Sequence, residues 1–185
     1  MKTFICFLLL SFVLPAQAQT VPIDRATRKV AFKETVLQNE ITQKELYSRA
    51  LRWCEGRYRA TRELPKRQRK LGLPLVNNAY HNIYIPTDLG PQAVRMYYTL
   101  EIVVDEKGYR YCLSNIYYRT YADRQHQSMT GEFSAELIFG EDGNQTAGNL
   151  QALSRLYYAA THQYAKQLLT DLKTAMNPDH TMTRN

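Results

Sequence analysis

The chain has 185 residues and a formal net charge of +7 at pH 7. The basic excess is concentrated in residues 57–70, where Glu63 is the sole acidic residue, so the charge excludes a protein that is basic over its whole surface. After residues 1–18, no stretch is apolar for long enough to cross a membrane. The remaining length suits one domain that buries roughly two-thirds of the surface of its unfolded chain.

Residues 1–18 have the features of a secretory signal peptide. An early lysine precedes the apolar run of residues 4–14, and Ala16-Gln17-Ala18 supplies an A-x-A cleavage sequence. The apolar run is too short to span a bilayer. We therefore expect cleavage after Ala18 and a secreted or periplasmic protein, with a single domain over residues 19–176 and a disordered tail over residues 177–185.

A strand and an amphipathic helix are predicted in the first part of the domain. Apolar residues alternate loosely over residues 29–37, which favours a first strand. Over residues 41–58 they recur every three to five positions, as on the buried face of a helix. Thr42 is a suitable N-cap for this helix, and Glu45 completes a capping box. Pro65 prevents the helix from continuing.

A long loop that can contain a short edge strand is predicted over residues 61–78, because Gly72 and Pro74 interrupt a stretch without a sustained period. A second strand follows over residues 79–85 and ends before Pro86. The loop carries a basic cluster, which can attract anionic envelope polymers or lipid headgroups. Most charge runs are solvated loops, and the sequence alone favours that interpretation. The basic cluster consists of Arg62, Lys66, Arg67, Arg69 and Lys70.

A β-hairpin over residues 94–116 is the clearest pattern in the chain. Every second residue is apolar over residues 94–104 and again over residues 109–113. The turn between them consists of three charged residues and Gly108, at positions 105–108. The inward face of the hairpin is predicted to contain Leu100, Ile102, Tyr109, Tyr111 and Leu113.

The same register predicts which residues meet on the outward face of the hairpin. The predicted pairs are Arg95 with Tyr118, Tyr97 with Ile116, Glu101 with Cys112, and Val103 with Arg110. Arg95, Tyr97, Arg110 and Tyr118 are therefore the candidate ligand-binding residues. The tyrosines can stack on a planar or sugar-like group while the arginines bind anionic groups. The plainer alternative, which the sequence alone favours, is that these are ordinary cross-strand pairs, since tyrosine suits strands.

The last part of the chain is predicted to form one more strand and a long helix. After the polar residues 120–131, apolar residues alternate over residues 133–139, which indicates a fifth strand. Apolar residues then recur at steps of three and four over residues 148–176, the pattern of the longest helix. The order strand, helix, four strands, helix predicts an α+β fold. We expect a curved antiparallel sheet with both helices on one face and the other face open.

Two cysteines, Cys54 and Cys112, remain after signal cleavage. The predicted register places Cys112 on the outward face, whereas the helix that carries Cys54 should cover the inward face. Two Cβ atoms separated by a sheet cannot form a disulfide, so free thiols are favoured. A β-bulge that moves Cys112 to the other face of the sheet would change this expectation.

Several short motifs resemble those of one family. They are Val21-Pro22-Ile23-Asp24, the segment from Lys29 to Glu34, Glu45-Leu46-Tyr47 with Arg49-Ala50-Leu51 and Trp53, and Lys107-Gly108-Tyr109-Arg110-Tyr111. The chain resembles the secreted bacterial domain of unknown function that has a TATA-binding-protein-like (TBP-like) fold, over roughly residues 21–120. The chain departs from that family at Arg28, where a turn glycine is usual, and at Asn77-Asn78. The resemblance implies a fold and an envelope location, and no activity or site residues.

No catalytic residue, metal site or cofactor motif is recognised. The four histidines are scattered over different predicted elements, and Cys112 has no identifiable histidine partner. Nucleic-acid binding would rest on the fold name alone, and export argues against it. We therefore predict a non-catalytic secreted or envelope module that binds an unidentified ligand or partner through the open sheet face. The candidate partners of the protein are an anionic envelope polymer and another protein. The alternatives are an accessory or structural envelope protein that assembles through that face and, less favoured, a hydrolase.

Overall fold

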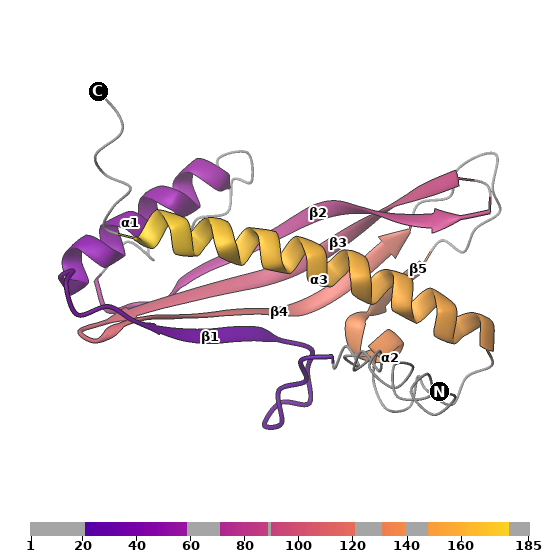
Figure 1. Cartoon of the computed structure of the whole chain (residues 1–185), viewed down its shortest axis with the longest axis horizontal. Helices are drawn as coiled ribbons and strands as arrows, with labels where there is room; N and C mark the ends of the chain where they lie inside the picture. The colour runs from indigo at the N-terminus through magenta and orange to yellow at the C-terminus, as the bar shows by residue number, and fades with distance from the viewer. Residues whose placement is uncertain (1–20, 59–70, 89, 121–130, 140–147, 178–185) are drawn as a thin grey trace, which may run out of the picture.

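The computed structural model describes residues 21–58, 71–88, 90–120, 131–139 and 148–177 (Figure 1). The expected signal peptide and residues 178–185 of the expected tail lie outside the described residues. The elements in chain order are β1 (Phe32–Leu37), α1 (Gln43–Arg57), β2 (Leu75–Thr87), β3 (Gly90–Asp105), β4 (Gly108–Thr120), β5 (Gly131–Ser134), α2 (Ala135–Phe139) and α3 (Gly148–Met176). The predicted α+β order is confirmed, with the short α2 in addition.

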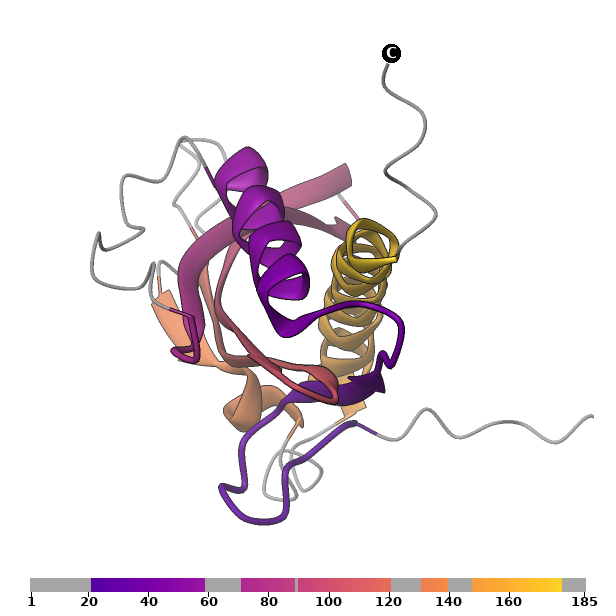
Figure 2. The same ribbon diagram turned by 90° about the vertical axis from the view of Figure 1, so that its left-hand side faces the viewer.

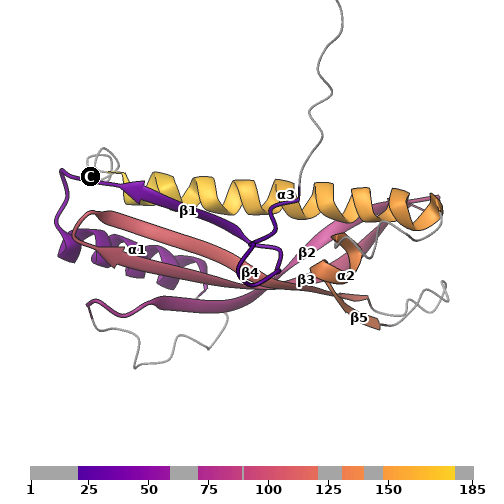
Figure 3. The ribbon, with the colours of Figure 1, turned by 90° about the horizontal axis from the view of Figure 1, so that it is seen from below.

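The strands form a five-stranded sheet in the order β1-β4-β3-β2, with β5 also paired to β4, and every pairing is antiparallel. Strand β1 pairs with the part of β4 next to the β3–β4 turn, where Leu37 lies opposite Gly108. Strand β5 pairs with the other end of β4, where Gly131 lies opposite Thr120. Because β3 occupies one edge of β4, β1 and β5 share the remaining edge at opposite ends (Figure 3).

The two long helices lie on the same side of the curved sheet, which is visible end-on in Figure 2. Their apolar faces and the inward residues of the strands form one core. Leu100 and Ile102 of β3 are fully buried, as are Leu46 of α1 and Leu168 and Leu172 of α3. The opposite face of the sheet, which we call the outward face, is not covered by α1 or α3.

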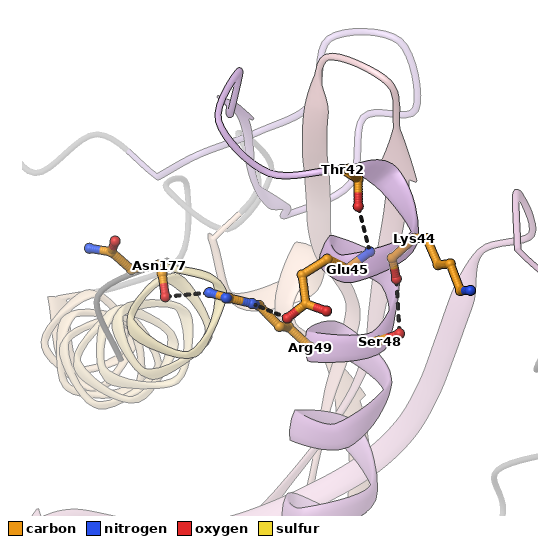
Figure 4. A network of polar contacts seen from close by, with 6 residues as sticks. All are labelled: Thr42, Lys44, Glu45, Ser48, Arg49 and Asn177. Atoms are coloured by element: carbon orange, nitrogen blue, oxygen red, sulfur yellow. Dashed lines mark hydrogen bonds and ion pairs between the residues drawn. The ribbon is translucent and has the colours of Figure 1, made fainter. Parts of the chain in front are cut away.

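Helix α1 begins as predicted, with Thr42 as its N-cap. The Thr42 side chain accepts a hydrogen bond from the Glu45 amide at 3.3 Å (Figure 4). The Glu45 carboxylate accepts a hydrogen bond from Arg49 Nε at 2.9 Å. Arg49 is almost completely buried, and its Nη1 donates to the Asn177 carbonyl at 2.6 Å. This contact places a cation at the C-terminal end of α3, where the helix dipole favours positive charge.

Strand β2 begins at Leu75, so residues 75–78 are the start of an edge strand, for which the prediction of a loop over residues 61–78 had left room. Leu75 and Asn77 are both buried and continue the inward alternation of Ala79. The alternation was hidden in the sequence because the inward residue Asn77 is polar. Its Nδ2 donates to the Cys54 sulfur of α1 at 3.3 Å, so this end of the buried amide has a partner in the core.

The prediction of a strand over residues 133–139 was correct only as far as Ser134, and residues from Ala135 to Phe139 form α2. The Ser134 hydroxyl accepts a hydrogen bond from the Leu137 amide at 3.3 Å, as an N-cap does. Ala135 and Phe139, four residues apart, are buried, whereas Leu137 is exposed. The apolar residues at alternate positions after Ser134 therefore belong to a short helix, in which Ala135 and Phe139 form the buried face.

The predicted register of the β3–β4 hairpin is confirmed next to the turn, where Glu101 lies opposite Cys112 and Val103 opposite Arg110. Farther from the turn the register shifts by one residue. Between the pairs Thr99 with Ser114 and Tyr97 with Tyr117, a single residue of β3 faces two residues of β4. This is a β-bulge, and Asn115 within it has a φ of 51°. The bulge reverses which face each later β4 side chain occupies.

Candidate binding surface

A row of three tyrosines crosses the outward face. Tyr80 of β2 lies opposite Tyr97 of β3, which lies opposite Tyr117 of β4. The ring centroids of Tyr80 and Tyr97 are 5.7 Å apart, and those of Tyr97 and Tyr117 are 4.7 Å apart with ring planes only 2° from parallel. We refer to Tyr80, Tyr97 and Tyr117 as the tyrosine row. Three adjacent strands hold it at fixed spacing, so it is preorganised.

Two arginines pack on the tyrosine row. The Arg95 guanidinium lies over the Tyr80 ring at 4.5 Å from its centroid, and the Arg119 guanidinium lies over the Tyr97 ring at 5.3 Å. Arg119 also forms an ion pair of 2.6 Å with Glu132 of β5. Arg95 and Arg119 are directly opposed across the strands, an arrangement that is unfavourable for like charges. The ring faces and Glu132 offset this repulsion.

A pocket of about 460 Å³ lies near the β3–β4 turn. It is formed by β1, β3 and β4, and its polar lining residues include Lys33, Glu101, Arg110 and Cys112. Lys33 also forms an ion pair of 2.9 Å with Asp24. Burial raises the pKa of the Cys112 thiol, which keeps the thiol protonated at neutral pH and therefore a poor nucleophile.

The structure distributes the four predicted binding residues over three environments. Arg95 and Tyr97 belong to the surface around the tyrosine row, whereas Arg110 lines the pocket near the turn. Tyr118 was wrongly predicted to face outward. It is fully buried on the inward face, and its hydroxyl lies 2.6 Å from that of Thr161 on α3. The bulge at Asn115 is the physical reason, since it exchanges the faces of the β4 residues that follow it.

The sequence pattern did not indicate Tyr80, Tyr117 and Arg119 as parts of this surface. Tyr80 was hidden because only a register for β2 places it beside Tyr97. Tyr117 and Arg119 were assigned to the wrong face by the uninterrupted register. One local signal was present, because asparagine adopts a left-handed conformation more readily than most residues. The basic cluster of Arg62, Lys66, Arg67, Arg69 and Lys70 lies outside the described residues.

Both cysteines are free, as predicted from their positions on opposite sides of the sheet. Cys54 is fully buried on α1, and burial raises its pKa to about 11. Cys112 is partly exposed on the outward face. The bulge does not affect this prediction, because Cys112 lies between the bulge and the turn, where the predicted register holds.

The described histidines pack against aromatic rings. His81 stacks on Tyr164 with ring centroids 4.0 Å apart, and His162 lies between Phe32 and Tyr158. Burial, together with Arg57, lowers the pKa of His81. Among the described residues, no three His, Cys, Asp or Glu side chains are grouped as metal ligands. Nor does any described helix have the length and apolar character needed to cross a membrane.

Comparisons with known proteins agree with this architecture. A TBP-like protein from Parabacteroides distasonis aligns with 84% of this chain and 96% of its own, with a TM-score of 0.64 and 17% sequence identity. A DUF4468 family protein from Bacteroides ovatus aligns with 85% of this chain and 90% of its own, with a TM-score of 0.57 and 15% identity. No curated protein matches the chain.

At these identities the structural likeness concerns the fold. A family model described as a domain of unknown function (DUF4468) with TBP-like fold matches residues 32–119, from the start of β1 almost to the end of β4. The matched segment contains the hairpin, the bulge and most of the outward face. The chain thus has a TBP-like fold, and its residues 32–119 match the DUF4468 family model.

Proposed function

We propose that the protein is a non-catalytic binding module outside the cytoplasm that binds an anionic polymer through its outward face. The observation that carries this proposal is the tyrosine row with Arg95 and Arg119 on a sheet face that α1 and α3 leave uncovered. Tyrosine and arginine are the residue types that contribute most often to binding hot spots. Because strands fix their positions, little conformational entropy is lost on binding.

The charges of this face favour an anionic partner. Arg95, Arg119, Lys33 and Arg110 supply positive charge from three strands, and the carboxylates on this side are those of Asp24, Glu101 and Glu132. Guanidinium groups bind carboxylates and sulfates with two parallel hydrogen bonds. An acidic polysaccharide presents such groups at regular intervals, together with apolar sugar faces that suit tyrosine rings. We therefore name an acidic polysaccharide of the envelope as the partner class.

The proposal can be tested with the chain from Gln19 onward, which we call the mature chain. Its retention on immobilised polygalacturonate is compared with its retention on neutral amylose. We expect retention on polygalacturonate that weakens with salt, and a loss of about tenfold in affinity, or about 1.4 kcal/mol, for Arg95→Ala or Tyr97→Ala. Arg155→Ala is the matched control, because Arg155 is an exposed arginine on α3. Equal retention of wild type, Arg95→Ala and Arg155→Ala would overturn the proposal.

The second candidate is an accessory envelope protein that assembles with another protein through the same face. The parallel stacking of Tyr97 on Tyr117 favours it, since each of these rings covers one face of the other. A protein partner can still contact the ring edges and hydroxyls. If polygalacturonate does not retain the chain, and the wild-type chain is an oligomer that Tyr97→Ala converts to a monomer, this second function is supported.

The proposed location depends on the signal peptide. Expression of the full chain with residues 1–18 in a secretion-competent bacterium should yield a protein whose mass and N-terminal sequence begin at Gln19. A cytoplasmic product that retains residues 1–18 would contradict the location without affecting the binding test.

A further inference from the structure

Strand β2 forms an edge of the sheet, at the end of the strand order opposite to β1 (Figure 3). It is 13 residues long, and its sequence LVNNAYHNIYIPT contains no charged residue. Natural proteins usually protect such an edge with lysine, with proline or with a bulge, because an open edge pairs readily with another strand. In β2 only Pro86, near its end, has this character.

The prolines of the β2–β3 hairpin show which backbone groups face the open edge. Pro86 lies opposite Pro91, and neither residue has an N–H group, so this position is a non-hydrogen-bonded pair. Hydrogen-bonded and non-hydrogen-bonded pairs alternate along an antiparallel ladder. The even-numbered residues of β2 therefore direct their N–H and C=O groups away from β3. These residues include Asn78, Tyr80, Asn82 and Tyr84.

The edge formed by Asn78, Tyr80, Asn82 and Tyr84 has no backbone partner within the described part of the chain. Its side chains are also accessible, since Tyr80 is 49% exposed and Tyr84 is 64% exposed. The tyrosine row ends at this edge with Tyr80. An uncharged, accessible row of unpaired backbone groups is the template for strand addition.

We infer that β2 pairs antiparallel with β2 of a second copy of this chain, about a two-fold axis next to Asn82. This register places Asn82 opposite Asn82 of the partner subunit, where the two amides can hydrogen-bond. It places Tyr80 opposite Tyr84 of the partner subunit, an aromatic cross-strand pair that extends the tyrosine row into the partner. The absence of charge in β2 favours a second copy, because no like charges are opposed across the axis.

Substitutions at Asn82 test this pairing in the mature chain by size-exclusion chromatography with light scattering over a range of protein concentrations. Asn82→Pro removes an N–H that faces the open edge and leaves the β2–β3 hydrogen bonds intact. Asn82→Ala keeps this N–H and is the matched control. We expect wild type and Asn82→Ala to be dimers, and the mass of Asn82→Pro to fall to half.

A second variant keeps the inference testable if Asn82→Pro does not fold. Asn82→Lys places two ammonium groups next to each other on the axis, and Asn82 is exposed in the monomer, so the variant should fold and dissociate most at low salt. Tyr97→Ala should leave this dimer intact, since Tyr97 lies on β3, and this outcome separates edge pairing from assembly through the outward face. A monomeric wild type, or a dimer in both Asn82→Pro and Asn82→Lys, would overturn the inference.

Discussion

Tyr97 and Tyr117 face each other across β3 and β4 with their rings stacked 4.7 Å apart, although an uninterrupted hairpin register pairs Tyr97 with Ile116. The one-residue bulge at Asn115 makes this contact. It brings Tyr117 to the outward face and sends Tyr118 into the core. A single backbone irregularity thus decides the composition of the candidate binding surface.

The backbone of Asn115 should limit which residues can replace it. Its φ of 51° suits asparagine or glycine and is costly for a β-branched residue. We expect Asn115→Val to lower the free energy of unfolding by about 1–3 kcal/mol in urea titrations. Asn115→Gly should cost less, although it loses the 2.9 Å hydrogen bond from Lys29. Equal losses in the two variants would argue against a left-handed residue at this bulge.

The opposite orientations of Tyr117 and Tyr118 can be tested by removing one hydroxyl at a time. Tyr118→Phe leaves the buried Thr161 hydroxyl without the partner that lies at 2.6 Å. We expect this variant to lose about 1–3 kcal/mol of unfolding free energy. Tyr117→Phe, the matched control on the outward face, should change stability by less than about 0.5 kcal/mol. If the larger loss occurred in Tyr117→Phe, the shifted register would be wrong.

Glu34 should contribute a pH-dependent part of the stability. Hydrogen bonds from Lys173, at 2.6 and 2.8 Å, and from Tyr111 hold the pKa of Glu34 below its usual value. The contribution is therefore present above the unfolded-state pKa of about 4.3 and is lost as the pH falls through the lower folded-state value. Because Glu34 and Lys173 are partly exposed, we expect less than about 1 kcal/mol.

Urea titrations of wild type and Glu34→Gln between neutral pH and pH 3 would measure this contribution. The difference in unfolding free energy between the two proteins should shrink as the pH falls below the usual range of a glutamate. Glu106→Gln, an exposed substitution in the β3–β4 turn, serves as the control and should show no comparable trend. A difference that grows with acidification would contradict the lowered pKa.

The two thiols should differ in their reactivity. Cys112 is partly exposed, whereas Cys54 is fully buried with its pKa raised to about 11. We expect a maleimide reagent to label Cys112 first in the native mature chain and to label both cysteines in denaturant. Cys112→Ser should abolish the fast phase. A native chain without reactive thiols that gains two on reduction would instead indicate a disulfide.

Local patterns in the sequence were sufficient for the hairpin, for the N-cap at Thr42 and for the order of the main elements. Each depends on residues that are near one another in the chain. The departure at Arg28 was also informative, since Arg28 has a φ of 55° where the family usually has a turn glycine. These features could be predicted because side-chain alternation and capping are set by neighbouring residues.

Contacts between distant segments decided the rest. Asn77 could be recognised as a core residue of β2 only through its hydrogen bond to Cys54 on α1. Asn115 is held in its left-handed conformation beside Lys29 and Thr99, which lie far from it in the sequence. The sequence by itself thus determined the main elements and their order, without the short α2. The tertiary structure alone decided which side chains share the outward face, because one inserted residue reverses every later position of a strand.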